Sequence, residues 1–370
     1  MDNPTFIIYA IAEMILSIFI SLSNALVIWV FIQHKCIRTA TNTYIFSLAV
    51  TDFLAGLIGV PFTVWSVITR SPKQFLPCLS VHLILCTLCT ISTFHLLAMA
   101  LDKYLTICSP LNAFFYFGKS SRHLRTVIML SLAWVCGFFI GTMPLFDAFG
   151  FSDHLKSAFT QLNECSFLYV VDVRYLVFVI FGGTIIIPSI IISFCYVAIY
   201  RRIRQDEAQV SCLLRASDRQ KRIRNRKKII RTLIVLVLTY AVCWYPLYLL
   251  NTANYLFSFY EPSLEATLFT VWLSHLCCAI NPIIYAYGMP GFKQFLRTFI
   301  KNRSSSRRNE QVTSIYHNGT TYNRVAFDVV ASRSKSLSNK KSPVVTNDIN
   351  YKRKLSVQEG SAYRLHSVAI

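Results

Sequence analysis

Five ionisable side chains lie within apolar stretches of this chain, and each needs a physical reason to be there. They are Glu13, Asp52, His82, His95 and His275. At the centre of a membrane, a charged side chain costs about 2.5–3.5 kcal/mol on insertion scales, and such residues usually face a partner or a water-filled cavity. These five positions are therefore the first candidates for binding or proton-transfer chemistry.

Asp52 ends the run Ser47-Leu-Ala-Val-Thr-Asp in the middle of an apolar stretch. A lone carboxylate in that place requires a cation, a proton or several hydrogen-bond donors. One interpretation is a proton relay. Another is a sodium site made of oxygen ligands from neighbouring helices, with Ser92 as a candidate second ligand. The residues alone leave both interpretations open.

Glu13 and His275 fall in corresponding halves of the first and last apolar stretches. Opposite partners across the interior of a helix bundle would satisfy each other. A carboxylate would also fix the imidazole tautomer and leave one ring nitrogen free for a ligand. The alternative is that each of the two side chains faces water independently.

The composition indicates what kind of protein must position these groups. The chain is 54% hydrophobic and 15% charged, whereas a soluble protein carries about 25% charged residues. The net charge of +20 is concentrated in two stretches, residues 201–231 and 293–370. Basic loops on a neutral, apolar body are typical of a membrane protein, not of a nucleic-acid binder. The sequence also has no Gly-rich phosphate loop, metal-ligand spacing or catalytic triad order, so we expect no enzyme.

Seven windows are long enough and apolar enough to cross a membrane as helices. They cover residues 3–35, 39–69, 74–101, 126–146, 175–200, 232–260 and 266–292. Soluble helices of such length would show a polar face. The predicted fold is therefore an all-α membrane protein with seven transmembrane helices.

The charges of the connecting segments predict the orientation. The segments that share a side with the C-terminus carry 33 Lys and Arg, and those that share a side with the N-terminus carry 4. Because positive loops stay in the cytoplasm, we expect the N-terminus to be extracellular and the protein to be a multi-pass protein of the plasma membrane.

Most of the 12 cysteines lie in apolar windows, where cysteine behaves as a small hydrophobic residue. Only Cys78 and Cys165 fall on the predicted outer side. Because that side is oxidising, a disulfide between them is expected. It would tie the second outer loop to the top of the third helix.

Residues 303–370 have a different composition, rich in Ser, Asn, Lys and Arg and without apolar periodicity. We expect a disordered, basic, cytoplasmic tail. Its Ser clusters could accept phosphate, which would reverse the local charge, and the alternative is an inert solvated tail.

We expect residues 1–302 to form one receptor domain, and the motifs of residues 7–302 resemble those of the rhodopsin-like (class A) G protein-coupled receptors. In chain order they are Asn24, Leu48-Ala-Val-Thr-Asp52, Asp102-Lys103-Tyr104, Trp134, Pro188 with Tyr196, Cys243-Trp244-Tyr245-Pro246 and Asn281-Pro282-Ile283-Ile284-Tyr285. A short amphipathic eighth helix with Phe292, Phe295 and Phe299 follows. Any one of these motifs is weak, but their order and spacing together are specific.

The resemblance implies coupling to a heterotrimeric G protein. The residues expected to take part are Asp102, Lys103, Tyr104, Leu111, Tyr196 and Tyr285. It also implies a sodium ion, as an allosteric modulator, held by Asp52, Ser92 and Asn281, and arrestin and receptor kinases as partners of the tail. No other cofactor is expected.

Two positions depart from this pattern. Lys103 stands where the family has Arg, which keeps the charge but loses the planar fork. The acid often found at the base of the sixth span is replaced by a basic run, Arg224 to Lys228. The inactive-state ionic latch would then be missing, which puts low basal activity in doubt.

Within the class, the chain is most similar to the adenosine receptors. That subfamily stacks adenine on a Phe after the loop cysteine, which corresponds to Phe167, and reads the adenine edge with an Asn, which corresponds to Asn251. It holds ribose with a Ser-His pair, here Ser274 and His275, supported by a Glu at the position of Glu13. Adenosine or a related purine nucleoside is therefore the expected agonist. Each of these side chains could instead have a local structural role, and the joint pattern favours binding.

Several positions of the expected pocket differ from the subfamily. Leu168 stands where a loop acid would help to bind the exocyclic amine, Cys89-Thr90 replaces a Thr-Gln pair, and Tyr248 replaces a His. Leu85 stands where amine receptors of the class have an Asp. Trp244 is expected below the ligand. A class A receptor for another small ligand remains an alternative, as does a transporter that uses Asp52, Glu13 and His275 as proton sites.

Overall fold

The computed structural model describes residues 4–33, 38–108, 119–147, 152–162, 164–210, 216–257 and 261–288. Within these ranges the secondary structure is helical, without strands. The elements are α1 (Pro4–Gln33), α2 (Ala40–Leu54), η2 (Ala55–Gly59), α3 (Val60–Thr69), α4 (Phe75–Ile107), α6 (Lys119–Thr142), η3 (Met143–Phe146), α7 (Ser152–Leu162), α8 (Phe167–Val170), η4 (Tyr175–Ile186), α9 (Ile187–Val210), α10 (Ala216–Leu256) and α11 (Leu264–Gly288). Leu111, the expected eighth helix and the tail from residue 303 lie outside the described residues.

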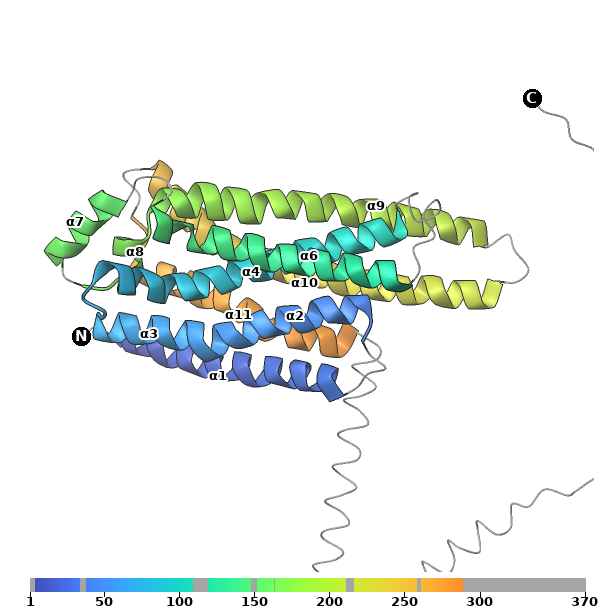
Figure 1. Ribbon diagram of the computed structural model, residues 1–370, viewed down its shortest axis with the longest axis horizontal. Coiled ribbons are helices and arrows are strands. Elements are labelled where there is room, and N and C mark those ends of the chain that lie inside the picture. The colour runs from blue at the N-terminus through green and yellow to red at the C-terminus, as the bar shows by residue number, and fades with distance from the viewer. Residues whose placement is uncertain are drawn as a thin grey trace, which may run out of the picture. The chain divides into compact units, whose positions relative to one another are not determined.

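Seven of these helical segments are long and apolar enough to cross a membrane. They are Pro4–Gln33, Ala40–Thr69, Phe75–Ile107, Arg122–Phe146, Tyr175–Ala208, Arg226–Leu256 and Leu264–Tyr285. Each one overlaps a window that the sequence predicted. In Figure 1 the long helices run along one direction, with α7 and α8 at the end where the chain begins. The chain is thus a multi-pass membrane protein.

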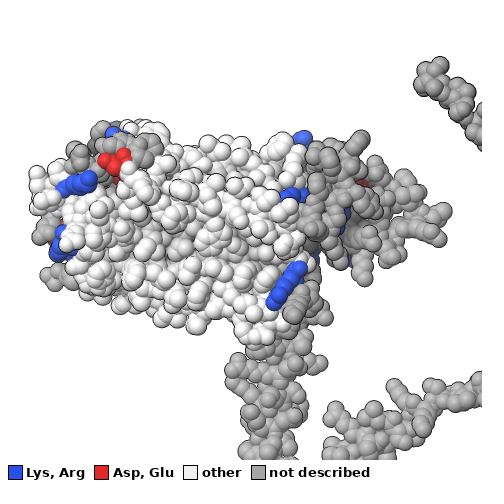
Figure 2. All heavy atoms as spheres, in the orientation of Figure 1, with Lys and Arg blue, Asp and Glu red and all other residues white. Residues whose placement is uncertain are grey.

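The surface of the bundle is apolar where lipid would contact it. On α1, Ile8, Ile15 and Leu22 are 67%, 65% and 68% exposed, while Ile20 and Val27 on the opposite face are buried. Figure 2 shows the middle of the visible face without charged atoms, and Lys and Arg only toward its two ends. Such exposure would be costly in water, and in a bilayer it costs nothing.

Two glycines set the spacing between α4 and α6. A Cβ added at Gly137 would lie 2.6 Å from Ile91 Cα, and one at Gly141 would lie 2.6 Å from Thr87 Cα. The two helices are therefore in backbone contact, as small residues four apart allow between transmembrane helices. This contact fixes α4, which also packs against α2 and α9.

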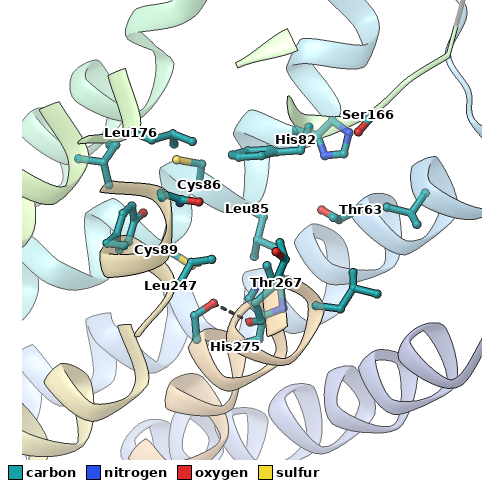
Figure 3. A pocket seen from close by; sticks show the side chains of 18 of the residues that line it. Thr63, His82, Leu85, Cys86, Cys89, Ser166, Leu176, Leu247, Thr267 and His275 are labelled. Carbon is teal, nitrogen blue, oxygen red and sulfur yellow. Dashed lines mark hydrogen bonds between the residues drawn. The ribbon is translucent and has the colours of Figure 1, made fainter. Parts of the chain in front are cut away.

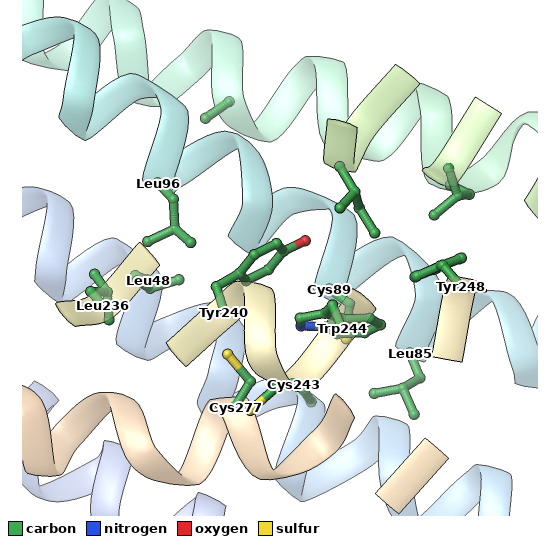
Figure 4. Packing of buried hydrophobic residues seen from close by; sticks show 14 of the residues in the cluster. Leu48, Leu85, Cys89, Leu96, Leu236, Tyr240, Cys243, Trp244, Tyr248 and Cys277 are labelled. Atoms are coloured by element: carbon green, nitrogen blue, oxygen red, sulfur yellow. The ribbon is translucent and has the colours of Figure 1, made fainter. Parts of the chain in front are cut away.

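An aromatic face of α10 fills the centre of the bundle. The rings of Tyr240, Trp244 and Tyr248 follow one another at 6.0 Å between centroids. Figure 4 shows Trp244 beside Cys89 of α4, with Tyr240 and Tyr248 on either side of it. All three residues belong to the buried apolar core, and all three line the cavity described next.

His95 has a complete set of partners inside the bundle. Its Nδ1 lies 2.7 Å from the carbonyl oxygen of Ile91, and its Nε2 lies 2.7 Å from Ser47 Oγ. Trp134 Nε1 donates to the same hydroxyl at 3.0 Å. Because Ile91 can only accept, Nδ1 carries the ring hydrogen and Nε2 accepts from Ser47. His95 therefore connects α2, α4 and α6, which is a structural role.

Candidate ligand-binding site

A cavity of about 390 Å³ opens between α1, α3, α4, α8, η4, α10 and α11. It lies at the end of the bundle that carries the Cys78–Cys165 disulfide, which we name the disulfide end. Small-molecule sites in proteins measure roughly 300–1,000 Å³, so the cavity suits a ligand of nucleoside size. In Figure 3, Leu85 and Cys89 of α4 and Thr267 and His275 of α11 stand around it.

The cavity brings together nine of the side chains that the sequence singled out for ligand binding. They are Leu85, Cys89, Thr90, Phe167, Trp244, Tyr248, Asn251, Ser274 and His275. Glu13 lies directly behind His275. Leu168 belongs to α8, and its side chain lies outside the described part of the structure.

The disulfide predicted from topology is present and holds the rim of the cavity. Cys78 and Cys165 are bonded with their Cα atoms 5.7 Å apart. The amide of Cys165 also donates to the carbonyl of Arg70 at 3.2 Å, and the Arg70 side chain forms an ion pair with Glu164. Phe167, two residues further on, is thereby held over the cavity, which its ring lines.

Glu13 and His275 form a pair across the bundle. Nδ1 of His275 lies 2.9 Å from Oε1 and 3.0 Å from Oε2 of Glu13. Glu13 is completely buried, and His275 is 6% exposed. The carboxylate makes Nδ1 the hydrogen-bearing nitrogen, because a carboxylate can only accept. In the neutral ring, Nε2 then keeps a lone pair for another donor.

Ser274, next to His275, offers an acceptor to the same region. Its hydroxyl donates to the carbonyl of Val271 at 2.7 Å, within α11. The single hydroxyl hydrogen is then used, and the oxygen lone pairs stay available. Asn251, on α10 beyond Pro246, lines the same cavity and has both an amide donor and a carbonyl acceptor.

A buried polar layer lies on α2, α4 and α11 around Asp52. Ser92 Oγ donates to one carboxylate oxygen at 3.2 Å, and Asn281 Nδ2 donates to the other at 2.8 Å. Asp52 is fully buried. Among the described residues, Asn281 Oδ1 and the Tyr285 hydroxyl have no hydrogen-bond partner. The sequence predicted Asp52, Ser92 and Asn281 as a sodium site, and this stays a prediction; the structure shows that their side chains lie together.

Asp102 on α4 forms ion pairs with two basic side chains, Lys103 and Arg125. The sequence analysis did not single out Arg125. Lys103 Nζ lies 3.3 Å from Oδ2, and Arg125 Nη2 of α6 lies 2.8 Å from Oδ1. Arg125 also donates to Thr106 Oγ1 at 2.6 Å. The expected neighbour Tyr104 packs its ring 6.0 Å from that of Phe194, while Tyr196 and Tyr285 are buried.

Ion pairs also join α9 and α10 at the end opposite the disulfide. Asp206 Oδ2 lies 4.0 Å from Arg226 Nη1, and Glu207 Oε1 lies 2.6 Å from Lys227 Nζ. Arg202, one turn back on α9, lies 3.5 Å from Asp206. The sequence pointed to a missing acid at the base of the sixth span, and the acids that face this basic run come from α9 instead.

The structure adds cavity residues that the sequence reasoning did not place there. They are, among others, Tyr9, Thr63, Arg70, His82 and Glu164. For His82 there was one signal in the sequence, which is an ionisable side chain in a window, residues 74–101, without Asp, Glu, Lys or Arg. Its position relative to Phe167 depends on the disulfide and on how α3 packs against α4, and periodicity does not report either.

Comparison with known proteins agrees with this arrangement. Residues 23–285 match the family model described as 7 transmembrane receptor (rhodopsin family). The chain is 28% identical over 303 residues to adenosine receptor A2b of Gallus gallus, covering 77% of this chain and 86% of that protein. It is 29% identical over 311 residues to adenosine receptor A2a of Homo sapiens, with 80% and 72% covered. It is 28% identical to adenosine receptor A3 of Ovis aries, with 80% and 90% covered.

The family model covers most of the chain, including all seven spans in whole or in part. Members of this family are signalling receptors and not enzymes, and the match favours a receptor over the transporter alternative. The chain belongs to the rhodopsin family of seven-transmembrane G protein-coupled receptors.

Proposed function

We propose that this chain is a receptor for adenosine or a closely related purine nucleoside, which binds in the cavity at the disulfide end. The observation that carries the proposal is the shared cavity of Phe167, Asn251 and His275, with Glu13 bonded to His275. These four groups come from four separate parts of the chain. Together they offer an aromatic face, an amide and an oriented imidazole around one small space.

The adenine end of the proposal rests on Phe167 and Asn251. An aromatic face suits a flat heterocycle, and stacking of a base on such a ring is worth about 1–3 kcal/mol. The amide of Asn251 can donate and accept along one edge, which matches the paired acceptor and donor of adenine. The relatives named adenosine receptors support the same ligand class.

The ribose end of the proposal rests on α11. Both Ser274 Oγ and His275 Nε2 present lone pairs, because their hydrogens are used by Val271 and by the tautomer that Glu13 selects. Acceptors suit the hydroxyl groups of a sugar. Cys89 and Thr90 stand on α4 across the cavity, and Thr90 Oγ1 already donates to the carbonyl of Cys86 at 2.8 Å. Fewer donors therefore remain on that wall.

In the proposed mechanism, the ligand biases two arrangements of the bundle by its differential affinity for them, typically worth about 1–3 kcal/mol. Trp244 lies at the cavity, and Pro246 removes one backbone donor inside α10, so in this proposal the helix pivots at this turn. The polar residues Asp52, Ser92, Asn281 and Tyr285 would transmit the change. The opposite end then admits a heterotrimeric G protein near Lys103 and Tyr104, with cyclic AMP as the expected readout.

The same proposal includes a bound sodium ion and an orientation of the chain in the membrane. Asp52, Ser92 and the orphaned Oδ1 of Asn281 are hard oxygen ligands that fit sodium, which would act as an allosteric modulator. The N-terminus would be extracellular and the protein would reside in the plasma membrane. Arrestin and receptor kinases would act on the tail from residue 303.

One experiment tests the function directly. Membranes that contain the full chain and G proteins are assayed for guanine-nucleotide exchange with and without adenosine. A saturable increase supports the proposal. If exchange does not change at millimolar adenosine while the receptor is present at the cell surface, the nucleoside assignment is wrong and the chain is a receptor for another ligand.

A further inference from the structure

His82 is a polar side chain of the cavity whose hydrogen bonding is incomplete. It lies on α4, lines the cavity and is 2% exposed. Its Nδ1 atom is buried and has no hydrogen-bond partner in the described part of the chain. A buried polar atom without a partner is unfavourable, because it has lost its contact with water and gained no hydrogen bond in return. A ligand group that reaches this nitrogen would remove that cost.

The disulfide determines what kind of group can bind there. Ser66 Oγ donates to Cys165 Sγ at 3.0 Å and lies 3.3 Å from His82 Nε2. A disulfide sulfur has no hydrogen, so the single hydroxyl hydrogen of Ser66 points to the sulfur. With its hydrogen on the sulfur, the Ser66 oxygen accepts from Nε2 of His82, and Nε2 also lies 3.7 Å from Cys165 Sγ, which can only accept. Nδ1 of the neutral ring is therefore an acceptor.

His82 stands next to the aromatic ring on which a purine would stack. The ring centroids of His82 and Phe167 are 5.6 Å apart, and their planes meet at 79°. Figure 3 shows His82 beside Ser166, at the end of the cavity away from His275. A flat ligand on Phe167, with its sugar toward His275, brings the rim of its heterocycle toward His82.

We propose that His82 is a specificity-determining residue that accepts a hydrogen bond from an N–H group on the rim of the ligand. The inference rests on the proposed nucleoside function and names the chemistry that the cavity selects, which is an amino-substituted purine. His82 supplies the acceptor for this group from α4.

The test compares two nucleosides that differ only in the amine. Adenosine and purine riboside, which lacks the amino group, are titrated against the purified full chain and its variants. We expect the unmodified chain to prefer adenosine. His82→Leu should reduce that preference by about fivefold to tenfold, the size of one hydrogen bond in a dry site. His82→Asn, which keeps an acceptor, should retain most of it.

Ser80→Ala is the control, because Ser80 lies on α4 two residues before His82, does not line the cavity and donates its hydroxyl to the carbonyl of Leu76 at 2.8 Å. It should leave the preference unchanged. If His82→Leu does not reach the membrane, Ser66→Ala takes its place. Without the Ser66 hydroxyl, the hydrogen of the His82 ring is no longer held on Nε2, so the preference for adenosine should also fall.

The two ways to fail are distinguishable. If the unmodified chain binds adenosine and the His82→Leu preference equals that of the unmodified chain, the role of His82 is overturned and the nucleoside function stands. If the unmodified chain binds neither nucleoside, the proposed function is overturned, and this inference falls with it.

Discussion

Glu13 and His275 are 262 residues apart in the chain, and their side chains meet at 2.9 Å inside the bundle. The pair joins α1 to α11, which also pack along their length. Because of this contact neither buried side chain lacks a hydrogen-bond partner, and the imidazole of His275 is held in one orientation. The energetic coupling of the pair is therefore measurable.

Glu13→Gln and His275→Ala should be strongly non-additive in nucleoside affinity. Either change alone breaks the pair, so the second change has little left to remove, and residues in contact typically couple by about 0.5–3 kcal/mol. Equilibrium binding to the two single variants and the double variant measures this coupling. Glu13→Gln combined with Phe167→Leu serves as the control, because no hydrogen bond, ion pair or ring contact joins these two side chains in the described part of the structure, so their effects should be additive. Strict additivity of the first pair would refute the coupling.

Asn251→Ala should abolish the adenosine response while surface expression persists. Loss of an amide that both donates and accepts leaves the purine edge unpaired, and we expect the affinity to fall by about a hundredfold or more. Asn254, one turn further on α10, is exposed and provides the control, since Asn254→Ala should respond normally. Guanine-nucleotide exchange against adenosine concentration is the measurement. A full response in Asn251→Ala would reject the adenine-edge role.

The seven helices, the disulfide and the Glu13–His275 pair could be predicted from the sequence. Each leaves a signal in contiguous residues or in the few charged and cysteine positions of the apolar windows and outer loops. Span length and hydropathy are properties of contiguous residues, and they identified all seven helices. The disulfide followed from the topology, since Cys78 and Cys165 alone fell on the predicted outer side. Glu13 and His275 were proposed as partners because opposite charges in a bundle interior need each other.

The remaining contacts depend on how helices cross, which periodicity does not encode. Arg125 reaches Asp102 only because α6 packs closely on α4. The hydrogen bonds of His82 depend on the loop that carries Cys165. The ion pairs of Arg226 and Lys227 depend on the length of α9 beyond the membrane window. Each of these requires the angle between two helices or the path of a loop.

Asp52→Asn should remove any dependence of agonist affinity on sodium. The substitution keeps the size of the side chain but removes the charge that the ion would neutralise, and Ser92 and Asn281 alone are weak ligands. Agonist binding is measured in sodium chloride and in choline chloride at equal ionic strength, so that general screening cancels. If the unmodified chain and the variant respond identically to sodium, the Asp52 layer does not hold the ion.

Asp206→Asn together with Glu207→Gln should raise basal guanine-nucleotide exchange. The two acids hold Arg226 and Lys227 and thereby keep the end of α10 against α9. Exposed ion pairs contribute up to about 1 kcal/mol each, so we expect an increase of roughly twofold to fivefold that shrinks at high salt. Arg202→Gln is the control, because Arg202 pairs with Asp206 within α9 itself. Unchanged basal exchange in the double variant would show that these pairs do not restrain α10.

Gly137→Ala should destabilise the bundle even though alanine favours helices. The new Cβ would lie 2.6 Å from Ile91 Cα and 2.9 Å from its amide nitrogen, and a neighbouring backbone cannot move aside as a side chain can. Overpacking of this kind costs about 1–3 kcal/mol, so the apparent melting temperature of the detergent-solubilised chain should fall by several degrees. Gly182→Ala is the matched control, because the nearest atom to its Cβ is a carbonyl oxygen at 3.6 Å. Equal melting temperatures for the two variants would mean that α4 and α6 do not depend on this close approach.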